Sequence, residues 1–263
     1  MDNISNAITK ILAKNPGKLT LKDCLQYSET PEEYMARHAR EDAEIVRRYN
    51  HKEAKRFLKD KSIYKKEGLI DKTYDDLDTN SDLKFKEIAR KTLDVVRDYV
   101  NGDLYNIILT GEPGAGKSLL ASCMLNKINQ SSDLKVFFVS IIVIKDLILS
   151  QYKTMYTDDK IDKSRQLEEF RRSLEQCDVV VLDDLGSEAG MRREVSEASQ
   201  SMQDELFDIG EKMEGKAVII TTNNSREEFQ KMYNPKIISR LFTANPDHVF
   251  NFNGISDYRI KHN

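Results

Sequence analysis

Residues 111–118 read Gly-Glu-Pro-Gly-Ala-Gly-Lys-Ser, which fits the phosphate-binding pattern G-x-x-x-x-G-K-[ST] without a mismatch. Glycines let the backbone turn tightly enough for its N–H groups to surround a polyphosphate, and the N-terminus of a following helix adds positive charge. Lys117 is then expected on the β- and γ-phosphates, and the hydroxyl of Ser118 on Mg²⁺. The alternative is a glycine turn that binds nothing. The residues expected to contact the nucleotide are Gly111, Glu112, Pro113, Gly114, Ala115, Gly116, Lys117, Ser118 and Leu119.

Paired carboxylates follow a second apolar run. Residues 179–182 read Val-Val-Val-Leu, and Asp183 and Asp184 come directly after them. At the end of a buried strand, one such acid helps to hold Mg²⁺ while its neighbour orients the attacking water. We predict that Asp183 is the Mg²⁺ residue and that Asp184 is the base. Two solvated acids at a strand end are the alternative interpretation.

A third polar position is Asn223, which follows the run Ile-Ile-Thr-Thr at residues 219–222. Ligands of open α/β domains collect at the carboxyl ends of the strands, so Asn223 would lie near the γ-phosphate or the lytic water. The sequence Asn-Asn-Ser is equally an ordinary turn and helix cap, and from the residues alone both interpretations stay open.

The elements that must position these groups alternate along the chain, and their apolar strands predict a parallel sheet with helices on both faces. We expect strands at residues 105–110, 136–139, 179–182, 217–221 and 248–252. We expect helices at residues 83–100, closed by Asn101-Gly102, and at 118–129, 143–152, 161–176 and 197–213, with short helices beginning at Arg226 and Pro235.

The first part of the chain has a different pattern. Apolar residues at helical spacing over 4–12 predict a short helix, which packs on its own region or occupies a partner's groove. The sequence Thr-Pro-Glu-Glu at 30–33 combines a capping box with proline at the first helical position, so a long polar helix should begin there and run past Lys55. We place the boundary near Lys72. This gives a helical N-terminal region, 1–71, and a nucleotide-binding domain, 72–263.

Composition narrows the class of protein. A length of 263 residues allows one α/β domain with an accessory region, and a net charge of −3 argues against a globally basic nucleic-acid coat. Cys24, Cys123 and Cys177 are too widely spaced to predict a disulfide framework or a C-x-x-C metal site. No apolar run approaches the roughly 20 residues that span a bilayer, so we expect a cytoplasmic protein with no membrane partner.

Taken in order, these motifs resemble those of the AAA+ ATPases and, within them, the bacterial replicative-helicase loaders of the DnaC/DnaI type, including phage versions. The resemblance covers about residues 72–259. It implies a P-loop AAA+ (ASCE) fold with no full C-terminal lid, and hydrolysis of ATP to ADP and phosphate. The motifs that carry it are residues 111–118, 183–188 (Asp-Asp-Leu-Gly-Ser-Glu), 221–223, 238–241 (Ile-Ser-Arg-Leu) and 257–259 (Asp-Tyr-Arg).

The resemblance also implies roles for single residues. Asn223 matches the sensor-1 position, and Arg240 looks like the arginine finger that reaches the nucleotide of a neighbouring subunit. Arg259 is similar to a near-terminal arginine with a sensor-2 role. Most AAA+ proteins have glutamate where Asp184 stands, and the shorter acid implies slow, switch-like hydrolysis.

A basic segment between the second and third predicted strands corresponds to a region that contacts single-stranded DNA in loaders. Lysine and arginine follow phosphates and an aromatic ring can stack on a base, so such binding should weaken steeply with salt. The residues concerned are Lys145, Tyr152, Lys153, Lys160, Lys163, Arg165, Arg171 and Arg172.

Three functions are compatible with this pattern. The first is ATP-dependent loading of a DnaB-type replicative helicase onto single-stranded DNA at initiation of replication, by a head-to-tail homo-oligomer whose N-terminal region holds the helicase. Cys24, His38 and His51 are the only candidate zinc ligands before Lys72, which favours a phage or mobile-element version. The second is an IstB-type AAA+ helper of a transposase, and the third is a small-molecule P-loop kinase.

Overall fold

The computed structural model describes residues 30–65, 68–79, 82–152, 158–187 and 196–256. The chain divides into two compact units, residues 1–49 and residues 50–263, and each is described by itself. The helix predicted at 4–12 lies outside the described residues. Among the described residues, no helix is both long and apolar enough to cross a bilayer.

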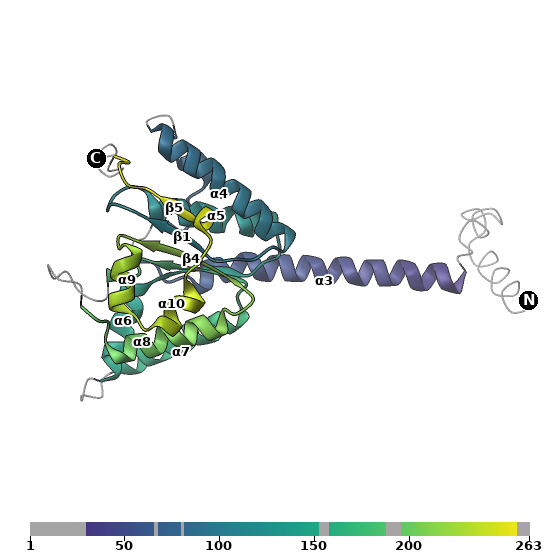
Figure 1. Cartoon of the computed structure of the whole chain (residues 1–263). Helices are drawn as coiled ribbons and strands as arrows, with labels where there is room; N and C mark the ends of the chain where they lie inside the picture. The colour runs from purple at the N-terminus through teal and green to yellow at the C-terminus, as the bar shows by residue number, and fades with distance from the viewer. Residues whose placement is uncertain (1–29, 66–67, 80–81, 153–157, 188–195, 257–263) are drawn as a thin grey trace, which may run out of the picture. The chain divides into compact units, whose positions relative to one another are not determined.

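A five-stranded sheet forms the centre of the larger unit, with the strand order β2-β3-β4-β1-β5. All four neighbouring pairs are parallel, so the carboxyl ends of the strands lie along one edge (Figure 1). This confirms the parallel sheet predicted from the apolar strands. The strands are β1 (Ile107–Thr110), β2 (Val136–Ser140), β3 (Val179–Asp183), β4 (Ala217–Thr222) and β5 (Val249–Asn251).

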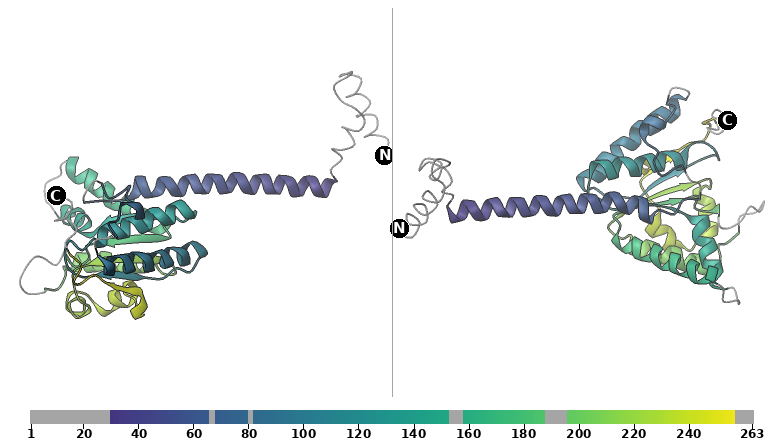
Figure 2. Two further views of the ribbon diagram at one scale, coloured as in Figure 1. Left: turned by 90° about the horizontal axis from the view of Figure 1, so that it is seen from above. Right: turned by 180° about the vertical axis from the view of Figure 1, so that it is seen from behind.

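Helices cover both faces of the sheet, as the views in Figures 1 and 2 show. Alternate residues of a strand point to opposite faces, so Val179 and Val181 join one core while Val180 and Leu182 join the other. The first core is closed by α4 (Leu83–Asn101) and α5 (Lys117–Ser131). The second is closed by α6 (Ile141–Gln151), α7 (Asp158–Gln176), α8 (Gln200–Lys212), α9 (Arg226–Met232) and α10 (Pro235–Leu241). Short 3₁₀ turns are η1 (Tyr74–Asp76) and η3 (Pro246–His248).

Helix α4 has the ends that its sequence predicts. Asp82 caps the N-terminus, where its carboxylate accepts hydrogen bonds from the N–H groups of Lys84 and Phe85. Gly102 closes the C-terminus with φ 101°, in the left-handed region that favours glycine. The helix therefore closes at Asn101 and Gly102, as expected.

A long helix, α3 (Pro31–Lys61), begins at the predicted capping box. The Glu33 carboxylate accepts the Thr30 N–H at 2.8 Å, and the Thr30 hydroxyl accepts the Glu33 N–H at 3.2 Å. In the first unit, the apolar side chains of Met35, Ile45 and Tyr49 are exposed. The predicted start of this helix and its extension past Lys55 are confirmed.

The last turns of α3 belong to the larger unit. Ala54 is fully buried, and Phe57 and Leu58 each join one of its two cores. Beyond the helix, Ile63 pairs with the outer edge of β2, because its N–H donates to the Phe138 carbonyl at 2.7 Å and its carbonyl accepts the Ser140 N–H at 2.8 Å. The larger compact unit thus begins at Asn50. That a partner-binding N-terminal region ends near Lys72 stays a prediction.

A partly buried ion pair joins α7 to α8. The guanidinium of Arg171 donates to the Glu205 carboxylate, with the shortest contact at 2.6 Å, and only 3% of the Glu205 side chain is exposed. A buried carboxylate without its cation is strongly destabilising. Arg171 is therefore a structural residue of this unit.

Replacing Arg171 with alanine should lower the free energy of unfolding by about 3 kcal/mol, because Glu205 would keep a buried charge without a partner. Chemical denaturation measures this. The matched control is Arg165→Ala, which breaks an exposed pair with Asp162 at 3.5 Å and should cost less than about 1 kcal/mol. Equal losses in both variants would contradict the assignment.

Candidate nucleotide-binding site

The phosphate-binding loop lies between β1 and α5, at the carboxyl edge of the sheet, and two of its glycines have no room for a side chain. Gly111 has φ 139°, and a Cβ there would lie 2.9 Å from the backbone of Phe252 and Asn253. Gly116 has φ 89°, and a Cβ there would lie 3.0 Å from the ring of Phe85. The close approach of neighbouring chain segments therefore requires glycine at both positions.

Lys117 is held at the centre of the loop. Its ammonium donates to the carbonyls of Gly111 and Glu112, both at 2.7 Å, and to Asn223 Oδ1 at 2.8 Å. Since only 7% of Lys117 is exposed, these contacts fix the charge close to the N–H groups at the start of α5. The structure thus brings Lys117 and Asn223 together, as their predicted roles require. A phosphate oxygen in the loop would compete for the same donors.

Asp183 lies at the end of β3, directly beside the loop. Its carboxylate accepts a hydrogen bond from the Thr221 hydroxyl at 2.7 Å and is hydrogen-bonded to Ser118. Burial raises the pKa of Asp183 and the neighbouring Asp184 raises it further, whereas the two hydroxyls and the Lys117 ammonium lower it. The predicted Mg²⁺ pair, Ser118 and Asp183, is therefore in contact. Hydroxyl and carboxylate oxygens are the ligands that Mg²⁺ prefers, so these residues fit the ion.

Asp184 adopts φ 65°, and it is the one non-glycine residue with a positive φ in the part of the chain that the structure describes. Its N–H donates to the hydroxyl of Thr221 at 2.9 Å. Such backbone strain persists where the surrounding contacts determine it, and it gathers at functional sites. The hydroxyl of Thr221 is thus shared by both acids. The sequence analysis did not assign this role to Thr221, because it depends on the register of β3 against β4.

Arg240 lies away from the loop of its own chain. Its guanidinium stacks over the ring of Phe207 at 4.4 Å and lies 3.7 Å from the Glu211 carboxylate. Its carbonyl accepts a hydrogen bond from Asn106, which precedes β1, whereas the loop begins at Gly111 after β1. Arg240 therefore does not join the other predicted residues. Arg259 lies outside the described residues.

The family is decided by the comparison of the sequence with known families. The model of a family described as IstB-like ATP binding protein matches residues 31–261 of this chain. The chain belongs to this IstB-like family. The membership and the observed parallel sheet confirm the predicted fold class, a P-loop α/β fold of the AAA+ type.

Solved structures similar to this IstB-like protein include DnaI, with 18% identity over 75% of this chain and 96% of that chain and a TM-score of 0.49. The DnaC helicase loader has 21% identity over 62% of this chain and 88% of that chain, with a TM-score of 0.44. AMPPCP-bound DnaA from Aquifex aeolicus has 20% identity over 67% of this chain and 50% of that chain, with a TM-score of 0.46. A comparison with curated proteins found no match.

The basic segment predicted to contact DNA lies largely on α7 of this IstB-like protein, and acids accompany several of its cations. Lys163 pairs with Asp159 at 2.9 Å, and Arg171 pairs with Glu205. Arg172 is exposed, and Tyr152 at the end of α6 is 70% exposed. Lys153 lies outside the described residues. The contribution of this segment to DNA binding stays a prediction.

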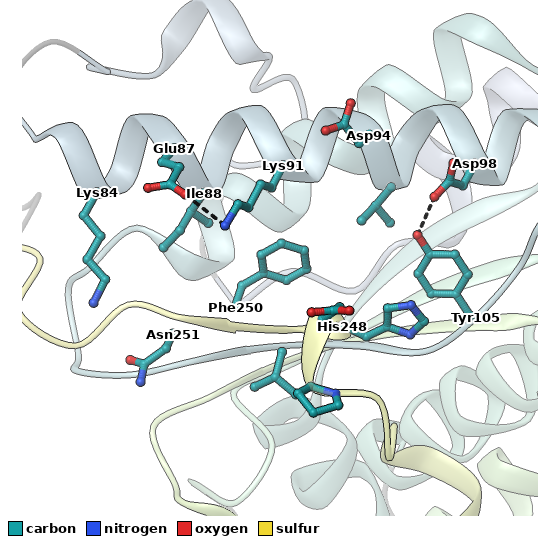
Figure 3. A pocket seen from close by; sticks show the side chains of 14 residues that line it. Lys84, Glu87, Ile88, Lys91, Asp94, Asp98, Tyr105, His248, Phe250 and Asn251 are labelled. Carbon is teal, nitrogen blue, oxygen red and sulfur yellow. Dashed lines mark hydrogen bonds and ion pairs between the residues drawn. The ribbon is translucent and has the colours of Figure 1, made fainter.

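A separate hollow lies between α4 and β5 (Figure 3), with Lys84, Glu87 and Lys91 on one side and His248 and Asn251 on the other. Both acidic and basic side chains line it, and Glu87 pairs with Lys91 at 2.9 Å. None of the predicted site residues lines it. It is therefore distinct from the nucleotide site of this IstB-like protein.

Replacing Asp183 with asparagine should stabilise the protein without nucleotide and remove its response to Mg²⁺. The amide keeps partners in Ser118 and Thr221 but carries no buried charge. At neutral pH we expect the thermal midpoint to rise by roughly 2–4 °C, the shift that 1 kcal/mol produces in a domain of this size. Calorimetry measures the midpoint, and titration with Mg²⁺ in the presence of ATP measures the lost response.

The pH dependence provides a control for this prediction. Because the folded pKa of Asp183 is raised, its stabilising contribution is complete below the unfolded pKa of about 3.9 and is lost as pH rises through the folded pKa. The gain from Asp183→Asn should therefore shrink as pH falls towards the unfolded pKa. A gain that is the same at every pH would contradict burial as its cause.

Proposed function

We propose that this protein is a Mg²⁺-dependent ATPase that loads a DnaB-type replicative helicase onto single-stranded DNA in the cytoplasm. The observation that supports the ATPase is the convergence of Lys117 with Asn223 and of Ser118 with Asp183 at one edge of the sheet. Membership of a family of ATP-binding proteins supports the same nucleotide.

Each residue then has a defined part in hydrolysis. Lys117 and the N–H groups at the start of α5 bind the β- and γ-phosphates, and Ser118 and Asp183 hold Mg²⁺, which neutralises charge between those phosphates. Asp184 acts as the base that orients water, and Asn223 positions that water against the γ-phosphate. The strained turn at Asp184, and an aspartate at the position where most AAA+ proteins have glutamate, fit a slow, switch-like reaction.

Arg240 completes the site of a neighbouring subunit in this proposal. Arg240 lies on α10, beside the residues that precede β1, so its guanidinium does not reach the phosphate-binding loop of the same chain. A head-to-tail homo-oligomer follows, because a finger and a loop on different surfaces form a heterologous contact.

A mixture of two inactive variants tests this arrangement. Lys117→Ala should lose ATP binding, and Arg240→Ala should bind ATP without hydrolysing it. In an equal mixture, roughly a quarter of the interfaces pair an intact loop with an intact finger, so about a quarter of the wild-type rate should return. Steady-state phosphate release measures it.

Glu211→Ala is the matched control for this experiment, because it removes the 3.7 Å ion pair of Arg240 and leaves the finger in place. It should hydrolyse ATP at the wild-type rate. A mixture that stays inactive, or an Arg240→Ala protein with normal turnover alone, would contradict a finger that acts between subunits.

The helicase contact is assigned to the N-terminal region, where α3 carries apolar side chains at helical spacing. Met35 is 70% exposed, Ile45 63% and Tyr49 67%. Amphipathic helices with such a face bind hydrophobic grooves of partner proteins. This face supports a protein partner for the region.

The double change Ile45→Asp and Tyr49→Asp in the full chain should weaken binding to a DnaB-type helicase of the native host by about tenfold or more, because it places charge in the proposed interface. Co-sedimentation with the helicase measures the affinity. The control is Glu44→Ala, which removes an acid paired with Arg48 on the same helix and should bind normally. Wild-type binding by the double variant would overturn the proposed contact.

A helper of a transposase is the second candidate, and the name of the matched family favours it. The ATPase steps are the same, and only the partner differs. Such a helper would bind and bend duplex DNA and would not retain the helicase. The same co-sedimentation, repeated with duplex DNA, distinguishes the two functions.

A further inference from the structure

The stem of the Arg240 side chain packs against a glycine of α8, the helix that contacts α10 (Figure 1). A Cβ on Gly210 would lie 2.9 Å from Arg240 Cβ and 3.1 Å from Arg240 Cδ. The Cβ of Arg240 is fixed by the backbone of α10, so it cannot swing aside as the end of a long side chain could. The Arg240 stem therefore crosses α8 at a position that has no space for a side chain.

The backbone of α8 does not itself require glycine at this position. Gly210 is helical and buried, and it lies inside the last turn of α8. Among the helices that the structure describes, α8 alone has a glycine in its interior. Glycine is less stable than alanine inside a helix. The close approach of Arg240 therefore accounts for the glycine.

One helical turn earlier, Phe207 supports the charged end of Arg240. Its ring is half-buried, and the guanidinium carbon lies 4.4 Å from the centre of the ring. Residues three apart share one face of a helix, so Phe207 and Gly210 present a single surface to Arg240. Stacking uses the flat face of the guanidinium and leaves the N–H groups in its plane available to an anion. In the described part of the chain, the guanidinium makes one hydrogen bond, from Nη1 to the Lys236 carbonyl at 3.2 Å.

The backbone of Arg240 is held in place as well. Asn106 Nδ2 donates to the carbonyls of Arg240 and Leu241 at 2.9 and 3.2 Å, and Asn106 Oδ1 accepts the Val218 N–H at 2.9 Å. Ile237 and Leu241 bury the other side of α10 in the core. Helix α10 therefore cannot move away from α8 without losing these contacts.

The ion pair of Arg240 with Glu211 contributes less to this arrangement. The two side chains are 3.7 Å apart, and 55% of the Glu211 side chain is exposed. Exposed ion pairs are weak because water screens them. The position of the guanidinium therefore depends mainly on Phe207 and Gly210.

We propose that Phe207 and Gly210 are positioning residues for Arg240, which hold its guanidinium ready for the phosphates of a nucleotide bound by a second copy of this chain. The inference rests on the proposed finger between subunits. A cation that is already oriented stabilises the transition state without a cost of reorganisation. Misplacement of a group by about 1 Å can lower a rate about 100-fold. Changes at Phe207 and Gly210 should therefore affect turnover and leave ATP binding intact.

The experiment compares Gly210→Ala and Phe207→Leu with the wild-type full chain. Affinity for a fluorescent ATP analogue should be unchanged, because the phosphate-binding loop lies at the opposite edge of the sheet. Steady-state phosphate release at saturating ATP should fall about 100-fold in Gly210→Ala and about tenfold in Phe207→Leu.

Two controls lie on the same helix. Phe207→Tyr keeps an aromatic ring under the guanidinium and should retain the wild-type rate. Asp208→Ala removes an exposed acid next to Phe207 and should also retain it.

Mixed assemblies show whether the lost rate comes from the finger. Gly210→Ala keeps an intact loop and Lys117→Ala keeps an intact finger, so an equal mixture should regain about a quarter of the wild-type rate. A mixture of Gly210→Ala with Arg240→Ala should stay inactive, because neither subunit supplies a working finger. A misfolded Gly210→Ala protein would regain activity in neither mixture.

Two results would overturn the inference while the proposed finger stands. One is wild-type turnover in both Gly210→Ala and Phe207→Leu when Arg240→Ala is inactive. The other is a Gly210→Ala protein that loses ATP affinity, or that Lys117→Ala does not rescue although it rescues Arg240→Ala. Normal hydrolysis by Arg240→Ala itself would overturn the proposed finger, and this inference with it.

Discussion

The hydroxyl of Thr221 is the contact on which the acidic part of the site depends. It donates to the carboxylate of Asp183 and accepts the N–H of Asp184, so one side chain sets both the orientation of the first acid and the strained turn at the second. Both bonds exist because β3 and β4 are parallel and in a fixed register. A valine of similar shape would fill the same space, but it would leave the Asp183 carboxylate with one hydroxyl partner fewer.

Several features at this edge of the sheet reduce the stability of the fold. Asp183 is a buried carboxyl with a raised pKa, Asp184 has a positive φ, and Ser140 carries an unpaired buried hydroxyl. These costs concentrate where the strands end, and they are offset by two apolar cores on the faces of the sheet. Backbone strain, buried charge and unpaired polar groups that occur together at one place are typical of a functional site.

Local signals in the sequence were sufficient for most of the fold. The capping box at Thr30 and the left-handed glycine at Gly102 depend on a few neighbouring residues, and both are present. The end of the N-terminal region was harder to place. Ala54, Phe57 and Leu58 are buried residues within a helix that is otherwise polar, so the start of the larger unit at Asn50 is hidden by the charged residues around them.

Pairings over long distances in the sequence could not be predicted. Arginine is a residue type that contacts DNA, and Arg171 was therefore predicted to do so. Its partner Glu205 lies on another helix, and only the packing of α7 on α8 brings the two side chains together. The pairing of Ile63 with the edge of β2 is likewise non-local in the sequence. Each strand pairing is non-local. The position of a strand can therefore be predicted from a single sequence more reliably than the order and register of the strands in the sheet.

The length of β1 explains why the predicted finger and the loop do not meet within one chain. The carbonyl of Arg240 is bound by Asn106 at the start of the strand, and Gly111 begins the loop at its end. Five residue steps of extended chain cover roughly 16 Å at about 3.3 Å per residue, which is longer than an arginine side chain. A four-residue strand is thus long enough to separate the two groups. The loop and the finger face opposite edges of one sheet, and in a head-to-tail assembly opposite edges of adjacent subunits can meet.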